Sequence, residues 1–382
     1  MRDISGRLDE RFQPVADAFL QGFEEGRDVG ASLAVFIDGA PVIDVWHGHV
    51  DRAGTIPWRE DTLVCMFSVT KAMAAVCLLQ AVARGQVELD APVADCWPEF
   101  AGQGKTGITL RHLLSHRAGL VGFHQPVDRD ILYDWDRVTA ALAAETPWWN
   151  PGEKHGYHAR TFGFLVGEVL RRRTGRSIGE WFRAEVAEPL GLDFAIGLPE
   201  RDLARCAEML PARLRPGVKQ DLPPGTREML RRFGDASTAT GAAFQNPSMG
   251  AGYMNSAKFR RAEIPAANGH GTARAAAGMY DRLATLLEAD VLAEATSTQS
   301  IGPDEVLRST THFGLGFMLH HDDTPVGLRS GSFGHAGAGG SMAFRDPAAG
   351  ISFCFAMNQM EMGVITGGAS ATRCATALYD CL

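Results

Sequence analysis

The two ends of this sequence are rich in β-forming residues, whereas the long stretch between them favours helices. Near the start, the apolar runs 31–37 and 40–48 flank an Asp-Gly turn at 38–39, the pattern of a tight β-hairpin. Near the other end, 339–346 and 351–358 predict a second hairpin. Strands at both ends with helices between them indicate one antiparallel sheet assembled from the two chain ends.

Helical spacing or helix-forming composition marks most of the remaining elements. Each chain end contributes one expected helix, near 8–26 and 367–380. In the middle, helices are expected at 68–84, 109–116, 136–145, 161–173, 178–187 and 275–290. The segments 211–224 and 241–271 lack periodicity and predict long surface loops, of the kind that often form lids or binding loops.

We therefore predict an α/β fold, in the α+β sense, with two lobes. Residues 1–65 and 275–382 are expected to form a discontinuous sheet lobe, whose antiparallel sheet is flanked by helices. Residues 66–274 are expected to form an inserted, mainly helical lobe with long loops, and the active site is expected between the two lobes.

Composition excludes several classes of protein. The 382 residues are 45% hydrophobic, enough for one large core or two joined lobes, and the formal charge of -8 argues against nucleic-acid binding. No apolar run approaches the ~18 residues that a membrane span needs. The start carries acidic residues and no apolar h-region, so it does not resemble a secretory signal. With seven cysteines and no Cys-x-x-Cys pair, we expect a cytoplasmic protein with reduced thiols, whose oligomeric state stays open.

One lysine stands out because lysine is scarce, with five lysines against 32 arginines. Lys71 follows Ser68 in a Ser-x-x-Lys motif, at the start of an amphipathic helix that should end at Gly85. Free N–H groups there can stabilise an oxyanion on a substrate attacked by Ser68. The helix N-terminus and burial would lower the pKa of Lys71, so that a neutral amine could take the serine proton. The alternative is an N-cap serine beside a snorkelling lysine.

A second cluster lies in 150–170, where a Pro-Gly turn leads into Tyr157 and then a helix. A tyrosine near a lysine could relay a proton to a leaving group, provided that the lysine's charge lowers its pKa. The alternative is a tyrosine packed at a helix start.

A third cluster is SFGHAGAGGSMAF at 332–344, whose glycines permit close backbone approach at a sheet edge. His335 could bind an anion or a polar group, and the N–H of Ala338 could join that of Ser68 in an oxyanion hole. The alternative is a glycine-rich turn with an exposed histidine.

In this order the three clusters resemble the serine β-lactamase and penicillin-binding-protein superfamily, and most closely its class C-like esterases, the family VIII carboxylesterases. The resembling segments are 68–100, 108–120, 151–158, 174–192, 264–284 and 334–358. The resemblance implies a β-lactamase/transpeptidase-like fold, with Ser68 as the nucleophile that forms an acyl-enzyme. It also implies Lys71 and Tyr157 as general base and acid, in an assignment that stays open because their titrations must be coupled.

Two departures from the family pattern bear on the substrate. His158-Ala159 follows Tyr157 where many β-lactamases have Tyr-x-Asn, so the carboxamide that grips a substrate amide is missing. His335-Ala336-Gly337 replaces the family's Lys-Thr-Gly, and a histidine with an unperturbed pKa of ~6.5 is mostly neutral at pH 7. Both changes weaken recognition of an anionic amide and leave ester acyl transfer intact.

We therefore expect a serine carboxylesterase that cleaves small esters with short acyl chains and needs no cofactor. Three alternatives stay open: a β-lactamase or D-amino-acid peptidase acting on amides, an acyltransferase using the same acyl-enzyme, and a non-catalytic binding protein on this fold.

Four further residues are candidates for substrate contacts. Trp148 and Trp149 could wall the acyl pocket, or form an ordinary aromatic pair. His270 and Arg274 lie where a glycine-rich loop enters a helix that faces the site in the resembling superfamily, so both could contact the substrate edge. The alternative for Arg274 is a structural ion pair.

The spacing of His112 and His116 matches that of zinc proteases, but Leu113 occupies the position where glutamate is required and no third ligand is evident. We expect no metal site.

Overall fold

The structure is a computed structural model of the 382-residue chain and describes residues 4–213, 224–362 and 367–382. Most of the loop expected at 211–224 therefore lies outside the described residues.

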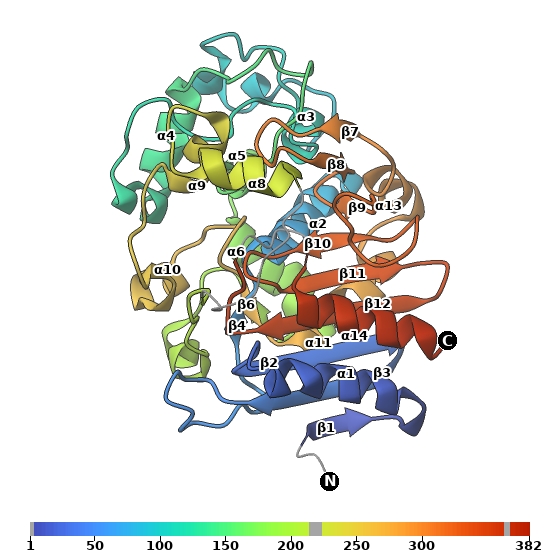
Figure 1. Ribbon diagram of the computed structural model, residues 1–382. Helices are drawn as coiled ribbons and strands as arrows, with labels where there is room; N and C mark the ends of the chain where they lie inside the picture. Colours follow the sequence, from blue (N-terminus) through green and yellow to red (C-terminus); the bar gives the residue numbers. More distant parts are fainter. Residues whose placement is uncertain (1–3, 214–223, 363–366) are drawn as a thin grey trace.

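The described chain contains a nine-stranded antiparallel sheet that runs from β1 at the bottom of Figure 1 to β7 at the upper right. Its order is β1-β3-β2-β12-β11-β10-β9-β8-β7. The strands are β1 (Ser5–Leu8), β2 (Gly30–Ile37), β3 (Ala40–Gly48), β7 (Ser300–Pro303), β8 (Thr310–Phe313), β9 (Met318–Leu319), β10 (Phe333–Ala336), β11 (Met342–Asp346) and β12 (Ile351–Met357). The N-terminal and C-terminal strands meet at the β2–β12 pair. This confirms the predicted sheet built from both chain ends.

Both predicted hairpins are present. In the β2–β3 hairpin, Asp38 and Gly39 have positive φ values of 49° and 83°. A type I′ turn with a two-residue loop requires positive φ at both of these positions. The second hairpin joins β11 to β12.

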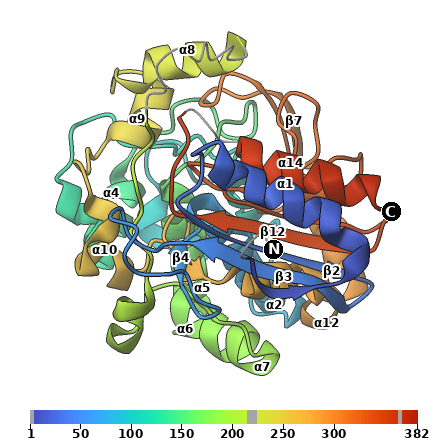
Figure 2. The same ribbon diagram turned by 60° about the horizontal axis from the view of Figure 1, so that its bottom comes forward.

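The inner strands are apolar on both faces because helices cover both sides of the sheet. Successive side chains of β2 point to opposite faces of the sheet. Leu33 packs in one core with α1 (Gln13–Glu24) and α14 (Ala369–Asp380). The next residue, Ala34, packs in the other core with α11 (Ala273–Asp281). Figure 2 shows α1 and α14 on one face of the sheet and α2 and α12 on the other.

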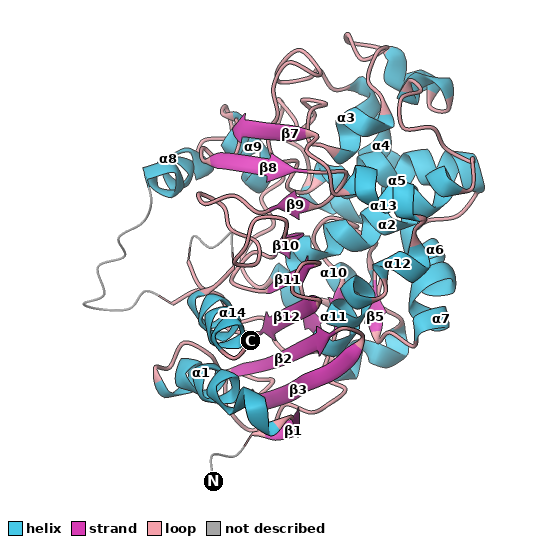
Figure 3. Ribbon diagram, turned by 90° about the vertical axis from the view of Figure 1, so that its right-hand side faces the viewer, coloured by secondary structure: helices cyan, strands magenta, loops and turns pink. Residues whose placement is uncertain are grey.

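Most of the other helices gather on the side of the sheet opposite α1 and α14, whereas α8 (Pro224–Phe233) lies on the side of α1 and α14, as Figure 3 shows. Besides α8, the other helices are α2 (Thr70–Ala83), α3 (Leu110–Leu114), α4 (Trp135–Ala144), α5 (Thr161–Thr174), α6 (Ile178–Phe182), α7 (Glu188–Leu190), α9 (Ala239–Gln245), α10 (Ala257–Arg261), α12 (Leu283–Leu286) and α13 (Ala289–Ala295). A small sheet joins β4 (Val64–Cys65), β6 (His270–Gly271) and β5 (Phe194–Ala195). Every helix in the described ranges is too short or too polar to cross a membrane. The boundaries of the two lobes stay a prediction.

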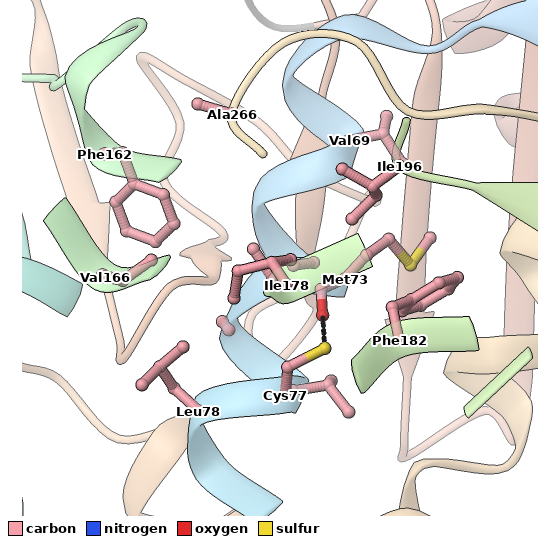
Figure 4. Close-up of a cluster of buried hydrophobic side chains, with 14 of the residues drawn as sticks. Val69, Met73, Cys77, Leu78, Phe162, Val166, Ile178, Phe182, Ile196 and Ala266 are labelled. Atoms are coloured by element: carbon pink, nitrogen blue, oxygen red, sulfur yellow. Dashed lines mark hydrogen bonds between the residues drawn. The ribbon is translucent and has the colours of Figure 1, made fainter. Parts of the chain in front are cut away.

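Helix α2 differs from the expectation in one respect. Its last residue is Ala83, and Gly85, with φ 66°, terminates it as predicted, but the helix is buried from Thr70 to Ala81 and is therefore not amphipathic. Figure 4 shows its apolar side chains among those of α5 and α6. The labelled residues are Val69, Met73, Cys77, Leu78, Phe162, Val166, Ile178, Phe182, Ile196 and Ala266. Packing on all sides fixes the position of the N-terminus of α2.

Several element boundaries differ from the sequence expectation. The helix expected over 178–187 continues beyond α6 as a π-helix, and the one expected over 275–290 is divided into α11, α12 and α13. The loop expected over 241–271 contains most of α9 and all of α10, which are short and begin at the side-chain caps Thr238 and Ser256. Strands β7 to β10 have two to four residues each, too few to show a period in the sequence.

Candidate active site

Ser68 lies in the turn directly before α2, at a point where the backbone is held in an uncommon conformation. The preceding residue, Phe67, has φ 44°, which a bulky side chain rarely adopts. The hydroxyl of Thr70 donates to the Phe67 carbonyl and accepts a hydrogen bond of 2.8 Å from the Gly269 N–H. These contacts hold the turn that presents the Ser68 hydroxyl.

Lys71 is fully buried, and its Nζ lies 3.2 Å from Ser68 Oγ. The same Nζ donates to the carbonyl oxygens of Ala159, at 2.8 Å, and Ala266, at 2.9 Å. Burial drives the pKa of Lys71 well below its usual value. A neutral amine keeps two N–H groups for the two carbonyls and leaves its lone pair for the Ser68 hydroxyl. This is the arrangement that a general base for Ser68 requires.

Tyr157 is also buried, with its ring centroid 4.6 Å from Lys71 Nζ. Its hydroxyl has no hydrogen-bond partner among the described residues. Burial raises the pKa of Tyr157, while the nearby Ser68 hydroxyl acts in the opposite direction. The expected lowering of this pKa by Lys71 is therefore not found, because burial of the phenol is the largest effect. Tyr157 is held as a phenol that can donate a proton.

Asp304 fixes the backbone around Tyr157, a role that the sequence did not indicate. Its Oδ1 accepts hydrogen bonds from the backbone N–H groups of Tyr157, at 3.1 Å, Val306, at 2.8 Å, and Leu307, at 2.7 Å. Burial raises the pKa of Asp304. The residue lies in an ordinary loop with no local motif, so only the tertiary structure shows its position.

A glycine allows α5 to pack against the segment that holds Lys71. A Cβ at Gly163 would lie 2.5 Å from the carbonyl carbon of Pro265 and 2.6 Å from the nitrogen of Ala266. The close approach brings the Ala266 carbonyl to Lys71. Neither Ala159 nor Ala266 was a candidate from the sequence, because both act through backbone oxygens.

His335 is buried on β10 rather than exposed. Its Nδ1 lies 2.7 Å from the Ala336 carbonyl oxygen, and its Nε2 has no partner among the described residues. Burial, with a contribution from Lys71, lowers the pKa of His335 to about 3, so the imidazole is neutral at pH 7. Beyond it, a Cβ at Gly337 would lie 2.5 Å from the Met66 carbonyl oxygen, so glycine allows this strand end to approach the Ser68 turn.

Ser68 and Ala338 both line a cavity of about 640 Å³, which we call the Ser68 cavity. Within the described ranges, neither the Ser68 nor the Ala338 N–H donates a hydrogen bond. The other lining residues are Phe67, Ala159, Arg160, Pro211, Ala212, Met229, Leu230, Phe233, Phe244, Gln245, Ser248, Met249, Gly250, Tyr253, Met254, Ala267, Gly339, Met360 and Glu361. The cavity is large enough for a small organic ligand and has mainly apolar walls.

The two tryptophans do not line the Ser68 cavity. Trp148 stacks on His124, with ring centroids 4.1 Å apart, and its Nε1 donates to the Gly122 carbonyl. Trp149 packs close to Gly156, where a Cβ would lie 2.6 Å from its ring. Their roles in substrate binding stay predictions.

His270 and Arg274 also lie outside the lining of the cavity. His270 is buried on β6, and burial lowers its pKa to about 4. Arg274 forms ion pairs with Asp44 and with Glu60, the latter at 2.9 Å. Their contacts with substrate likewise stay predictions.

The two histidines with zinc-protease spacing have separate positions. The Nδ1 of His112 accepts the Thr109 N–H at the start of α3, whereas His116 is buried with its ring centroid 5.1 Å from that of Tyr157. Among the described residues, no group of three or more His, Cys, Asp or Glu is placed to hold a metal ion.

Comparison with known proteins agrees with this geometry. The β-lactamase family model matches residues 15–370. The chain is 36% identical over 372 residues to the esterase/β-lactamase LipL of Mycobacterium tuberculosis, an alignment that covers 94% of this chain and 84% of LipL. A crystal structure of a family VIII carboxylesterase superposes with a TM-score of 0.89 at 38% identity, and a penicillin-binding-protein homologue from Caulobacter crescentus with 0.88 at 38%. Both cover 100% of each chain. The chain therefore belongs to the β-lactamase family, on the fold that it shares with family VIII carboxylesterases.

Proposed function

We propose that this protein is a serine hydrolase that cleaves small carboxylic esters through an acyl-enzyme on Ser68. The observation that carries the proposal is the buried Lys71 amine, bound to two carbonyl oxygens and 3.2 Å from Ser68 Oγ. A neutral amine at that position can remove the hydroxyl proton as the serine oxygen attacks a carbonyl carbon.

In the first half of the reaction, Ser68 Oγ bonds to the ester carbonyl carbon and its proton passes to Lys71 Nζ. The free N–H groups of Ser68 and Ala338 stabilise the negative oxygen of the tetrahedral intermediate. The bond to the alcohol oxygen then breaks, and a proton from Lys71 or the Tyr157 phenol neutralises the leaving alkoxide. In the second half, the same groups take a proton from water as its oxygen bonds to the acyl carbon; the bond between that carbon and Ser68 Oγ then breaks, the carboxylic acid leaves, and the proton passes to Oγ.

An ester is favoured over an amide by two features of the site. His335 is neutral, so β10 offers no cation to a carboxylate in the position of the family's lysine. Ala159 offers no carboxamide to grip a substrate amide. The solved structure with the TM-score of 0.89 is a carboxylesterase, which also supports an ester.

The preference for short acyl chains is part of the proposal. The Ser68 cavity of about 640 Å³ has the size of a site for a small organic ligand, which supports a small ester as substrate. β-Lactam hydrolysis is the second candidate, because LipL is named an esterase/β-lactamase.

The test is hydrolysis of 4-nitrophenyl acetate, butyrate and octanoate, and of a chromogenic cephalosporin, by the purified protein and by Ser68→Ala. We expect rapid cleavage of the short esters, slow cleavage of the cephalosporin, and loss of both in the variant. Equal ester rates in the two proteins would contradict the proposal. Adding an alcohol acceptor and analysing the products separates hydrolysis from acyl transfer.

A further inference from the structure

We propose that Arg160 binds a carboxylate on the substrate, so that the preferred esters carry an anionic group on an apolar arm. This inference rests on the proposed esterase function and adds the chemical class of the substrate.

Arg160 is placed beside the reacting groups by the chain itself. It follows Ala159, whose carbonyl oxygen accepts from Lys71, and it directly precedes α5. Arg160 and Ser68 line the same cavity. A ligand that occupies the cavity while its ester contacts Ser68 can therefore also reach this guanidinium.

The Arg160 guanidinium has no carboxylate partner among the described residues. Its one hydrogen bond there is donated by Nη1 to the Pro247 carbonyl oxygen. A guanidinium has five N–H donors and can hold a carboxylate through two parallel hydrogen bonds, so most of this group's donor capacity is unused. Several other partly buried arginines do have a carboxylate partner, as Arg176 has in Glu185 at 2.8 Å.

The surroundings of Arg160 make an unpaired charge costly. Arg160 is partly buried, and this burial lowers the pKa of its guanidinium. The cavity walls are mainly apolar and include the methionine and phenylalanine side chains of Phe67, Met229, Phe233, Phe244, Met249, Met254 and Met360. A buried cation is stabilised by a paired anion, and an incoming carboxylate would supply that anion.

Glu361, the other charged side chain in the cavity lining, does not form an ion pair with Arg160. Glu361 accepts a hydrogen bond of 3.3 Å from the Ala369 N–H and lies 3.9 Å from Arg27. Because His335 is neutral, the site also has no cation at the end of β10. Anion recognition is therefore assigned to the α5 side of the cavity.

The experiment compares esters of matched shape and different charge. The probes are 4-nitrophenyl hydrogen succinate, glutarate and adipate, each beside its neutral methyl ester, with kcat/KM measured for each. A second pair places the carboxylate on the alcohol side, as 4-butanoyloxyphenylacetate and its methyl ester. We expect at least one anionic probe to be favoured over its neutral partner by ~10-fold or more, the scale of one charge-assisted hydrogen-bonded pair.

The variants assign this preference to Arg160. In Arg160→Met the ratio of anionic to neutral kcat/KM should fall to near unity, and because the ratio is taken within one protein, a change in rate common to both esters cancels. Arg160→Lys should keep part of the preference because it keeps the cation. A wild-type protein that prefers the neutral probe in every pair, or an unchanged ratio in Arg160→Met, would overturn the inference.

A binding measurement separates this inference from the proposed function. Glutarate, added to the catalytically blocked Ser68→Ala protein, should raise its thermal unfolding temperature, and it should not raise that of Ser68→Ala/Arg160→Met. If no ester is cleaved but this difference is found, the esterase proposal fails and anion binding by Arg160 stands. Equal responses of the two proteins to glutarate would count against Arg160.

Discussion

Replacing His158 by glutamine is expected to make the fold less sensitive to acid. In the structure, His158 is fully buried and uses both ring nitrogens. Its Nδ1 lies 2.8 Å from the Gly156 carbonyl oxygen, and its Nε2 accepts the Leu120 N–H at 3.1 Å. A second ring proton would face that N–H donor, so the folded protein holds the imidazole neutral. Burial, with a smaller contribution from Lys71, lowers the pKa of His158 from 6.5 to about 3.

The magnitude follows from the difference between the folded and unfolded pKa values. Because the folded pKa is lowered, the unfolded chain binds a proton first as the pH falls. The contribution of the neutral ring to the free energy of unfolding is therefore fully present above pH 6.5 and is lost as the pH falls toward 3. At pH 5, which is ~1.5 pH units below the unfolded value, the loss is ~2 kcal/mol.

The assay is urea unfolding of the wild type and His158→Gln at pH 7 and pH 5. Glutamine keeps an acceptor for the Leu120 N–H and removes the titration. Between pH 7 and pH 5, the free energy of unfolding should fall by ~2 kcal/mol less in the variant than in the wild type. Other titrating groups are common to both proteins, so their effects cancel when the two changes are subtracted. His270→Gln should behave similarly, because the pKa of His270 is lowered to about 4. An identical loss in the wild type and both variants would refute the reasoning.

Three further predictions concern the reacting groups. Gly163→Ala should cost ~1–3 kcal/mol of unfolding free energy and lower kcat, because its Cβ would lie 2.6 Å from the nitrogen of Ala266; unchanged thermal unfolding and activity would contradict this. Asp304→Asn should lower kcat ~10-fold or more with little change in KM, since it disturbs the carboxylate that holds the Tyr157 backbone, and a fall in ester affinity alone would count against that role. Because burial lowers the pKa of Lys71, kcat/KM should rise with pH with an apparent pKa well below 10.5. An apparent pKa near 10.5 would show that the amine is charged in the working enzyme.

The parts of the fold that sequence reasoning predicted are those set by local patterns. The β2–β3 hairpin follows from the Asp38-Gly39 turn between apolar runs, and the end of α2 follows from Gly85. Strands β7 to β10 are too short for a period to appear, and their pairing depends on the partner strands. The continuous burial of α2 could not be predicted either, since it depends on α5 and α6 packing around it.

The candidate site likewise has features that the sequence indicates and features that only the folded chain shows. Ser68 and Lys71 are one helical turn apart, so their proximity is a local property that the sequence indicates. The Ala159 and Ala266 carbonyls come from segments far away in the chain and act through the backbone, which no side-chain motif can reveal. The raised pKa of Tyr157 depends on burial, and burial is known only once the chain is folded.

The central claim, that Ser68 is the nucleophile, is tested most directly by the mass of the protein after reaction with a fluorophosphonate. We predict one adduct per chain, mapped by peptide sequencing to Ser68, and a parallel loss of esterase activity. Ser68→Ala should gain no adduct, and Arg160→Met should still be labelled. Ester hydrolysis by a protein in which Ser68 stays unmodified, or whose adduct maps to another residue, would contradict the account.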